Sequence, residues 1–299
     1  MELILTNYNH SSQKRKPGRS RSFPCLSEKA KLSGKSWAFI LIMLICFFNG
    51  VMALADGVKP GSISGRVMID EDLPMANGQI FIFDDSTGAP PSFYKYWRVP
   101  DEVVNIGADG TFRAVLADGK YYLGAIKRKS DEEMGPLQEG DLFLPFYANG
   151  APIKYAITDG SSIDLGIISG AMPFRKSILK TGTGVTAIEG TVTNLRGKPL
   201  ENALVFAFPT QAMVGKPLFI SEKTGKDGKY LLRVYQGGNY YLKIRNSYGG
   251  GAMKAGEIMG SYGRDRPVAV GVKTGDTVKG IDITGTIFAG QGPKNNSKK

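Results

Sequence analysis

The chain has 299 residues, of which 42% are hydrophobic and 22% are charged, a balance typical of a protein that buries a core. At about 150 residues per domain, this length predicts two domains. Only His10, Cys25 and Cys46 carry an imidazole or a thiol. A chain that loses this N-terminal segment can form no disulfide, no zinc site built on His or Cys, and no His- or Cys-dependent catalytic site. We therefore expect a protein that is not an enzyme and that holds no metal or other cofactor.

Residues 1–55 have the organisation of an export signal with a long basic front. A polar, basic stretch over 1–37 precedes an apolar run over 38–55, which ends in Ala-Leu-Ala at 53–55. Signal peptidase needs small side chains in this pattern, so we predict a cleaved signal peptide and export through the general secretory route to the periplasm or the cell exterior. The alternative is an uncleaved signal anchor in the inner membrane, because 18 apolar residues just span about 30 Å of hydrocarbon. In either case we expect membrane contact only through this segment.

The formal net charge of +11 is unevenly distributed along the chain. Residues 56–168 carry 10 basic and 17 acidic side chains, whereas residues 169–288 carry 17 basic and 8 acidic ones. The chain behind the leader is therefore an acidic half joined to a basic half. These halves are either two independently solvated surfaces or partners in electrostatic docking, between themselves, head to tail between molecules, or on an anionic surface. Nucleic acid is not an expected partner, because an exported chain without a basic helix or a basic-aromatic RNA-binding motif offers it no recognition element.

An internal repeat relates the two halves at an offset of 115 to 125 residues. The matches include an Asp-Gly turn followed by an aromatic residue, and a Gly-x-Tyr-Tyr-Leu run in each half. Two copies of one unit therefore account for nearly all of the chain behind the leader. The matching segments are 62–67 with 187–192, 73–85 with 198–210, 108–112 with 226–230, and 119–123 with 238–242.

Both repeats have the sequence pattern of β-strands. Small and large apolar side chains alternate over 203–208, and lysine and arginine interrupt the apolar residues over 229–234. Asp-Gly, Gly-Lys-Pro and Gly-Gly supply turns between strands. No segment shows a sustained helical period. Seven short strands in about 115 residues predict an antiparallel sandwich. The predicted fold class is all-β, with two tandem seven-stranded antiparallel β-sandwiches of an immunoglobulin-like kind after an N-terminal signal helix. Further strands are predicted over 218–221, 239–245, 268–272 and 280–284.

The second repeat carries a motif that extends over more than half of its length. It reads G-x-V-x-x-x-x-G-x-P-L-x-x-A-x-V, then T-x-x-D-G-x-Y and G-x-Y-x-L. With this motif it resembles the carboxypeptidase regulatory-like domain, a transthyretin-like β-sandwich of exported bacterial proteins. The resemblance implies a binding or structural module that supplies no catalytic residues itself. The motif residues are Gly190, Val192, Gly197, Pro199, Leu200, Ala203, Val205, Thr224, Asp227, Gly228, Tyr230, Gly238, Tyr240 and Leu242.

The first repeat matches the same motif more sparsely, because it lacks the Gly-x-Pro turn and carries an insertion near 86–106. Its matching residues are Gly65, Val67, Pro74, Ala76, Asp109, Gly110, Phe112, Gly119, Tyr121 and Leu123. The predicted domains are a signal segment over 1–55, an acidic sandwich over 56–168, a linker over 169–186, a basic sandwich over 187–288 and a disordered basic tail over 289–299.

The insertion in the first repeat holds the strongest candidate for a binding site. Four aromatic residues occupy five positions within a segment bounded by prolines, which includes the only tryptophan behind the leader. Rigid aromatic rings give a large contact area at low entropic cost, so the segment could stack on a sugar ring or a protein loop. The alternative is that Phe93 and Trp97 plug the open end of the sandwich. The candidate ligand- or partner-binding residues are Phe93, Tyr94, Tyr96, Trp97 and Arg98.

Two other features offer weaker candidates. The glycine-rich connection over 246–266 lacks the Gly-Lys-Ser/Thr of a phosphate loop and is predicted to be a surface loop, with Arg264 and Arg266 as candidate anion contacts. The acidic residues over 70–72 and 84–85 are predicted to be solvated turn residues. Calcium is the alternative, although the loop pattern of an EF-hand is absent.

These patterns predict an exported, non-catalytic binding or scaffold protein of the cell envelope, and an accessory subunit of a surface or periplasmic assembly. Open strand edges would accept a partner strand, and the opposite charges of the halves would set its orientation. The alternative is a carbohydrate-binding module that uses the aromatic insertion over 93–97 to hold a polysaccharide.

Overall fold

A computed structural model describes residues 59–129, 135–179, 184–248 and 253–290. The predicted signal segment, with His10 and both cysteines, lies outside the described residues, as does most of the predicted tail. All described residues belong to one unit, Gly57–Lys299. Within the described residues, no helix has the length and apolar character needed to cross a membrane.

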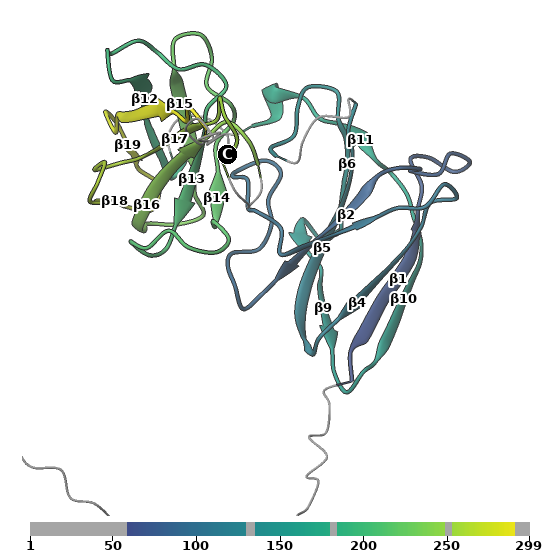
Figure 1. The fold of residues 1–299 in the computed structure, drawn as a ribbon. Helices are drawn as coiled ribbons and strands as arrows, with labels where there is room; N and C mark the ends of the chain where they lie inside the picture. The colour runs from purple at the N-terminus through teal and green to yellow at the C-terminus, as the bar shows by residue number, and fades with distance from the viewer. Residues whose placement is uncertain (1–58, 130–134, 180–183, 249–252, 291–299) are drawn as a thin grey trace, which may run out of the picture. The chain divides into compact units, whose positions relative to one another are not determined.

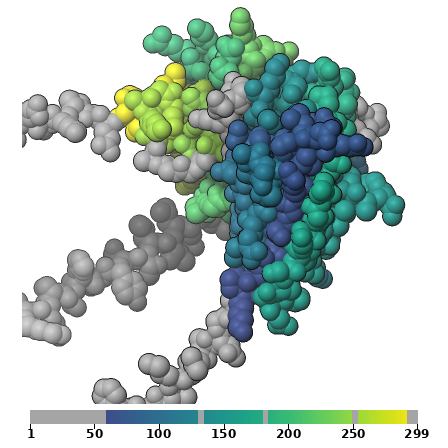
Figure 2. Space-filling view, turned by 90° about the vertical axis from the view of Figure 1, so that its right-hand side faces the viewer, coloured from purple at the N-terminus to yellow at the C-terminus, as the bar shows by residue number. Residues whose placement is uncertain are grey.

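The first half contains eleven strands among its described residues, and they form two sheets and a small hairpin (Figure 1). They are β1 (Gly61–Val67), β2 (Gln79–Asp84), β3 (Glu102–Asn105), β4 (Thr111–Leu116), β5 (Gly119–Lys127), β6 (Leu142–Pro145), β7 (Tyr147–Ala148), β8 (Ala151–Pro152), β9 (Lys154–Ile157), β10 (Ser162–Ile168) and β11 (Met172–Pro173). One sheet has the order β10-β1-β4, and Figure 2 shows it with β1 in the middle. The other has the order β11-β6-β5-β2-β3, with β9 also paired to β5.

The second half contains nine strands among its described residues, preceded by a 3₁₀ turn, η1 (Lys176–Ile178). They are β12 (Ala187–Asn194), β13 (Leu204–Phe208), β14 (Phe219–Ile220), β15 (Lys229–Arg233), β16 (Gly238–Arg245), β17 (Ile258–Ser261), β18 (Ala269–Val272), β19 (Thr277–Val278) and β20 (Ile283–Ile287). Their order is β14-β13-β16-β17-β20-β12-β15, with β18 paired to β16 and β19 to β12. Strand β20 joins the two layers, because one end pairs with β12 and the other with β17.

The all-β fold class is confirmed. In the part of the chain that the structure describes, η1 is the only helical turn. The sandwiches are not purely antiparallel, since β10 runs parallel to β1, and β19 and β20 run parallel to β12. These parallel neighbours arise because the chain returns to its first strand after a long excursion through the opposite sheet, rather than through a hairpin.

The same pairings occur in both halves, as the internal repeat predicts. The pairs β1–β4, β2–β5, β5–β6 and β5–β9 correspond to β12–β15, β13–β16, β16–β17 and β16–β18. The Asp-Gly turn, which occurs in both halves, shows why the strands pair in the same way. Gly110 and Gly228 have φ of +87° and +71°, and a Cβ there would lie 2.6 Å from the Val67 carbonyl oxygen and 2.5 Å from that of Val192. Only glycine fits this turn against the first strand.

Most strands predicted in the second half lie where the alternation placed them, but the last one is shifted. The prediction was 280–284, whereas β20 begins at Ile283. Gly280 has a left-handed φ of +72°, and the carboxylate of Asp282 accepts the backbone N–H of Thr191 at 2.8 Å. A side chain therefore replaces a ladder partner, and the strand starts only after it.

Strands β2 and β13 are each buried on both faces of the sheet rather than on one. On β13, Ala203 (just before the strand) and Val205 face the core, whereas Leu204 and Phe206 belong to a second apolar cluster on the outer face of the sheet. On β2, Phe81 and Phe83 likewise belong to a second apolar cluster on the outer face of the sheet. Period-two alternation predicts one buried face, so additional segments must cover the outer one.

Candidate functional site

The aromatic insertion of the first half covers the outer face of its own sheet. Phe93 lies 5.3 Å from Phe143 and 5.9 Å from Trp97 between ring centroids, and Trp97 lies edge-on to Phe81 at 6.2 Å. Tyr94 adds an edge-to-face contact with Phe143 at 5.9 Å. Phe93 and Trp97 are therefore satellite core, as one alternative predicted, but they lie on the face of the sheet rather than at its open end.

Tyr96 points the other way and belongs to the core of the second half. Its ring packs edge-on to Phe219 and Tyr235, each at 5.5 Å, and its hydroxyl donates to the carbonyl of Pro90 at 2.5 Å. Burial raises the pKa of Tyr96, so the phenol stays protonated. One short segment thus supplies aromatic rings to two hydrophobic clusters on opposite sides.

The backbone after Tyr96 extends the sheet of the second half. The N–H of Val99 donates to the carbonyl of Leu218 at 3.1 Å, and the N–H of Ile220 donates to the carbonyl of Trp97 at 3.3 Å. Arg98 and Phe219 are paired as in an antiparallel ladder. Residues 97–99 therefore cap the free edge of β14, a strand addition made within one chain.

Arg98 holds this segment in place and is only 3% exposed. Its Nη2 donates to the carbonyl of Asp84 at 2.6 Å and to the side chains of Thr87 and Asp101 at 2.9 Å each, while Nη1 donates to the carbonyl of Ala89. The guanidinium also lies 5.4 Å from the Phe83 ring centroid. Burial lowers the pKa of Arg98 and the charge of Asp101 opposes this. These contacts occupy the guanidinium group within the protein.

Asp101 connects the two halves electrostatically. It accepts from Arg98 and from the backbone N–H of Asp84, and it also pairs with Lys216 of the second half. A further ion pair joins the exposed Lys176 of η1 to the half-buried Glu222 at 3.6 Å.

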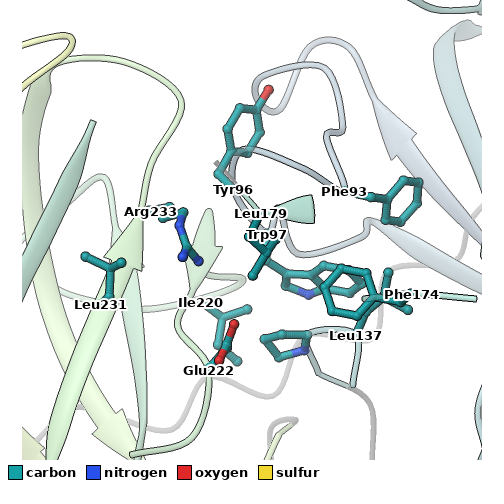
Figure 3. A pocket seen from close by; sticks show the side chains of 11 residues that line it. Phe93, Tyr96, Trp97, Leu137, Phe174, Leu179, Ile220, Glu222, Leu231 and Arg233 are labelled. Atoms are coloured by element: carbon teal, nitrogen blue, oxygen red, sulfur yellow. The ribbon is translucent and has the colours of Figure 1, made fainter. Parts of the chain in front are cut away.

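Figure 3 shows the space that remains beside this segment. Phe93, Tyr96 and Trp97 line it from the first half, and Ile220 and Arg233 from the second. Its volume is about 30 Å³, which holds a water molecule but no sugar ring. Because Phe93 and Tyr96 are buried and Tyr94 and Trp97 are half-buried, the segment presents no open stacking platform of the kind we expected.

The two predicted anion contacts lie in different places. Both are exposed, but only Arg264 lines a groove, of about 410 Å³, while Arg266 does not. We call this the outer groove. Its other residues were not found from the sequence because they come from several separate segments, and the methionines at 253 and 259 near Arg264 were the available signal. Its lining residues are Leu195, Met213, Lys243, Arg245, Met253, Met259, Gly260, Ser261, Arg264, Asp265, Thr284 and Thr286.

Strand register explains the shape of the outer groove. Arg245 lies beside Met259 and Met259 beside Thr286, so β16, β17 and β20 contribute neighbouring side chains on the outer face. Lys243 lies beside Ser261 in the next row. A larger hollow of about 750 Å³ adjoins it and shares Met213, Lys243 and Arg245.

The acidic residues of the first half act as turn and ion-pair groups. Asp70 accepts the N–H of Leu73 at 2.9 Å, and Asp85 pairs with Lys154 at 2.9 Å and accepts the hydroxyl of Tyr122 at 2.7 Å. These two partners lower the pKa of Asp85. The described residues contain no group of three or more His, Cys, Asp or Glu side chains placed to hold a metal ion.

No family model and no curated protein matches the chain. Among solved structures it is similar to a streptococcal ancillary pilin, at 12% identity and a TM-score of 0.23, over 76% of this chain and 63% of that one. It is also similar to the TIE protein of Bacillus anthracis, at 14% identity and a TM-score of 0.24, over 76% and 34%. A DUF3823 family protein from Parabacteroides merdae matches at 13% identity and a TM-score of 0.23, over 73% and 100%. The chain thus spans less than two thirds of the first two proteins.

Proposed function

We propose that the chain is an exported, non-catalytic binding or scaffold protein of the cell envelope, and an accessory subunit of a surface or periplasmic assembly. The observation that carries this proposal is the capping of β14 by residues 97–99, with Tyr96 in the core of the second half. A subunit that presents surfaces to other proteins gains from two sandwiches that keep a constant spacing, because a flexible pair would lose entropy on every binding event.

The exposed edges of the first half support a role in assembly. Strand β10 is seven residues long and, among the described strands, pairs only with β1, and Ile167 on it is 71% exposed. Such an edge can accept a strand from a partner. Gly166, with φ of +65°, accompanies a bulge in the middle of β10, which limits indiscriminate pairing and favours a partner that matches the bulge.

Fractionation and co-purification of the full chain from intact cells test the proposal. We expect the protein in the envelope or extracellular fraction, and bound to other envelope proteins at about 0.15 M salt but not at about 1 M, where charge attraction is screened. A protein found only in the cytosol, or running alone at every ionic strength, would contradict the proposal.

A pair of variants tests the capping segment within the same experiment. Val99→Asp places a charge in the buried junction, and Val115→Asp places the same charge on the exposed outer side of β4. Val99→Asp is expected to reduce co-purification about tenfold and Val115→Asp to leave it within about twofold. Circular dichroism of both variants distinguishes loss of the junction from loss of the fold. Equal co-purification of both variants would contradict the claim that the fixed spacing of the two sandwiches supports binding.

A further inference from the structure

The outer groove is an apolar surface that the described residues leave open. Leu195 at its rim is 69% exposed and Met259 on its floor is 39% exposed, with Met213 and Met253 half-buried beside them. Clustered exposed apolar groups mark interaction sites, and unbranched methionine adapts its shape to a bound apolar side chain. Ser261, Thr284 and Thr286 are short, so the floor is hollowed between longer side chains.

Backbone conformation singles out the same groove. Among the described residues other than glycine, positive φ occurs at asparagine and aspartate, which tolerate it, and at Met213 and Arg264, with φ of +45° and +52°. Bulky residues adopt the left-handed region only at an energetic cost, and such residues cluster at binding sites. Both of these line the outer groove.

The charges of the outer groove favour an acidic ligand. Arg245 pairs with Glu257 at 2.8 Å, and the hydrogen bond from Arg245 lowers the pKa of Glu257. Lys243 and Arg264 form no ion pair within the described residues, and the carboxylate that lines the groove with them is Asp265. Two cations therefore remain for a partner, in a half with 17 basic and 8 acidic side chains.

The equivalent face in the first half shows what kind of chain can occupy it. There β5 and β6, the counterparts of β16 and β17, are covered on the outer face by another segment of the same protein, which turns at 93–95 and packs Phe93 and Trp97 on Phe143 and Phe81. Anionic polysaccharides and lipid headgroups would satisfy the cations but would leave the methionines uncovered. A peptide with alternating apolar and acidic side chains satisfies both.

We propose that the outer groove binds an extended acidic segment of a partner protein, whose apolar side chains pack on Met213, Met253 and Met259 and whose carboxylates pair with Lys243 and Arg264. This inference rests on the proposed function, because it names the kind of partner that the assembly would supply. The bound segment would cover the outer face of β16, β17 and β20, as residues 93–97 cover that of the first half.

Fluorescence anisotropy of the purified full chain tests the proposal, with a labelled peptide of alternating glutamate and leucine as the probe. We expect saturable binding, and weaker binding by at least about tenfold for matched peptides in which lysine or glutamine replaces glutamate. Lys243→Glu and Arg264→Glu should each reduce affinity about tenfold. Arg266→Glu, a charge reversal two residues away and outside the groove, should change it less than about twofold.

Three results would overturn the inference: no binding of the glutamate–leucine peptide, equal binding of all three peptides, or equal losses for Arg264→Glu and Arg266→Glu. Binding of anionic phospholipid vesicles or of an acidic polysaccharide that is lost in Arg264→Glu, without peptide binding, would also overturn it. If the peptide fails while the full chain still co-purifies with envelope proteins, the groove inference is wrong and the proposed function stands. If both fail, the proposed function is wrong as well.

Discussion

The outer faces of the two main sheets differ although their strands pair in the same way. In the first half, Phe143 on β6 is 0% exposed, because Phe93, Tyr94 and Phe174 pack on it. In the second half, Met259 occupies the corresponding strand β17 and is 39% exposed. Around β6 the outer face has become a hydrophobic core, whereas around β17 it has remained a surface, although Val99 and Phe206 form a buried cluster over β13 of the same half.

This difference separates what the fold requires from what it permits. The inner positions must be apolar in both halves, since they fill the space between the layers. The outer positions depend on whether another segment covers them: the insertion of the first half covers β6 of its own sheet, and its residues 97–99 reach β13 and β14 of the second half but leave Met259 on β17 exposed. The open face in the second half is therefore where a partner-dependent function can develop without disturbing the core.

Truncation of Phe143 and of Met259, which occupy equivalent positions on β6 and β17, should show the difference between the covered and the open face most strongly. Phe143→Ala removes a buried ring that contacts three others, and we expect a loss of about 4 kcal/mol in the free energy of unfolding. Met259→Ala on the open face should change it by less than about 0.5 kcal/mol. Urea unfolding of both variants measures the two values. Similar losses would mean that the two faces do not differ.

Tyr96→Ala should destabilise the second half, although Tyr96 lies in the first half of the sequence. Its ring contacts Phe219 in the second half, so the change leaves a cavity there and should cost about 3 kcal/mol. Hydrogen exchange should then accelerate in β13 and β14. Tyr94→Ala is the control, because Tyr94 contacts Phe143 of the first half, and it should accelerate exchange in β6. Faster exchange in the first half alone for Tyr96→Ala would contradict the assignment of the ring.

Arg98→Met should reveal the importance of the buried guanidinium group. Methionine keeps much of the volume but removes one donor from Asp101 and one from the carbonyl of Asp84 in a buried network, and we expect a loss of about 2 kcal/mol. Lys95→Met removes a positive charge from the exposed side of the same segment and should change stability by less than about 0.5 kcal/mol. Thermal or urea unfolding compares them; equal effects would show that the network does not stabilise the fold.

The pH dependence of stability should carry a small contribution from Asp85. Its pKa lies below the ordinary value of 3.8, first because Lys154 donates to it and then because Tyr122 does. The folded protein therefore binds this proton less readily than the unfolded chain, so the contribution is present above about pH 4 and is lost as the pH falls through the lowered pKa. Asp85→Asn should lose less stability than the wild type between about pH 5 and pH 3. The same pH dependence of stability in Asp85→Asn and the wild type would contradict this contribution.

Local sequence pattern was sufficient for the fold class and for most strands of the second half. Alternation at 203–208 and the Asp-Gly turns at 110 and 228 depend on neighbours within a few residues, and such signals are visible in the sequence. The start of β20 was placed too early because the Asp282 carboxylate, rather than the backbone, pairs with Thr191. That contact joins residues far apart in the chain.

The candidate sites depended on contacts of longer range, and there the sequence was a weaker guide. Proline-bounded aromatic residues indicated a rigid segment, but whether Tyr96 meets a sugar or Phe219 is decided by a residue more than a hundred positions away. The same applies to Arg98, whose pattern suggested an exposed binding side chain although it is buried. Arg264 is exposed, as expected for a surface loop, but the predicted loop over 246–266 contains β17, and the groove beside Arg264 requires β16, β17 and β20 to be assembled first.

Site-specific photo-crosslinking in intact cells tests the central contrast most directly. A photoreactive amino acid placed at position 259 lies in the outer groove, at position 143 it lies in the covered face, and at position 115 it lies on an exposed strand elsewhere. We predict adducts with one or a few envelope proteins from position 259, none from position 143, and at least about tenfold less of the same adducts from position 115. Absence of adducts from position 259, or the same adducts in equal yield from position 115, would contradict the account.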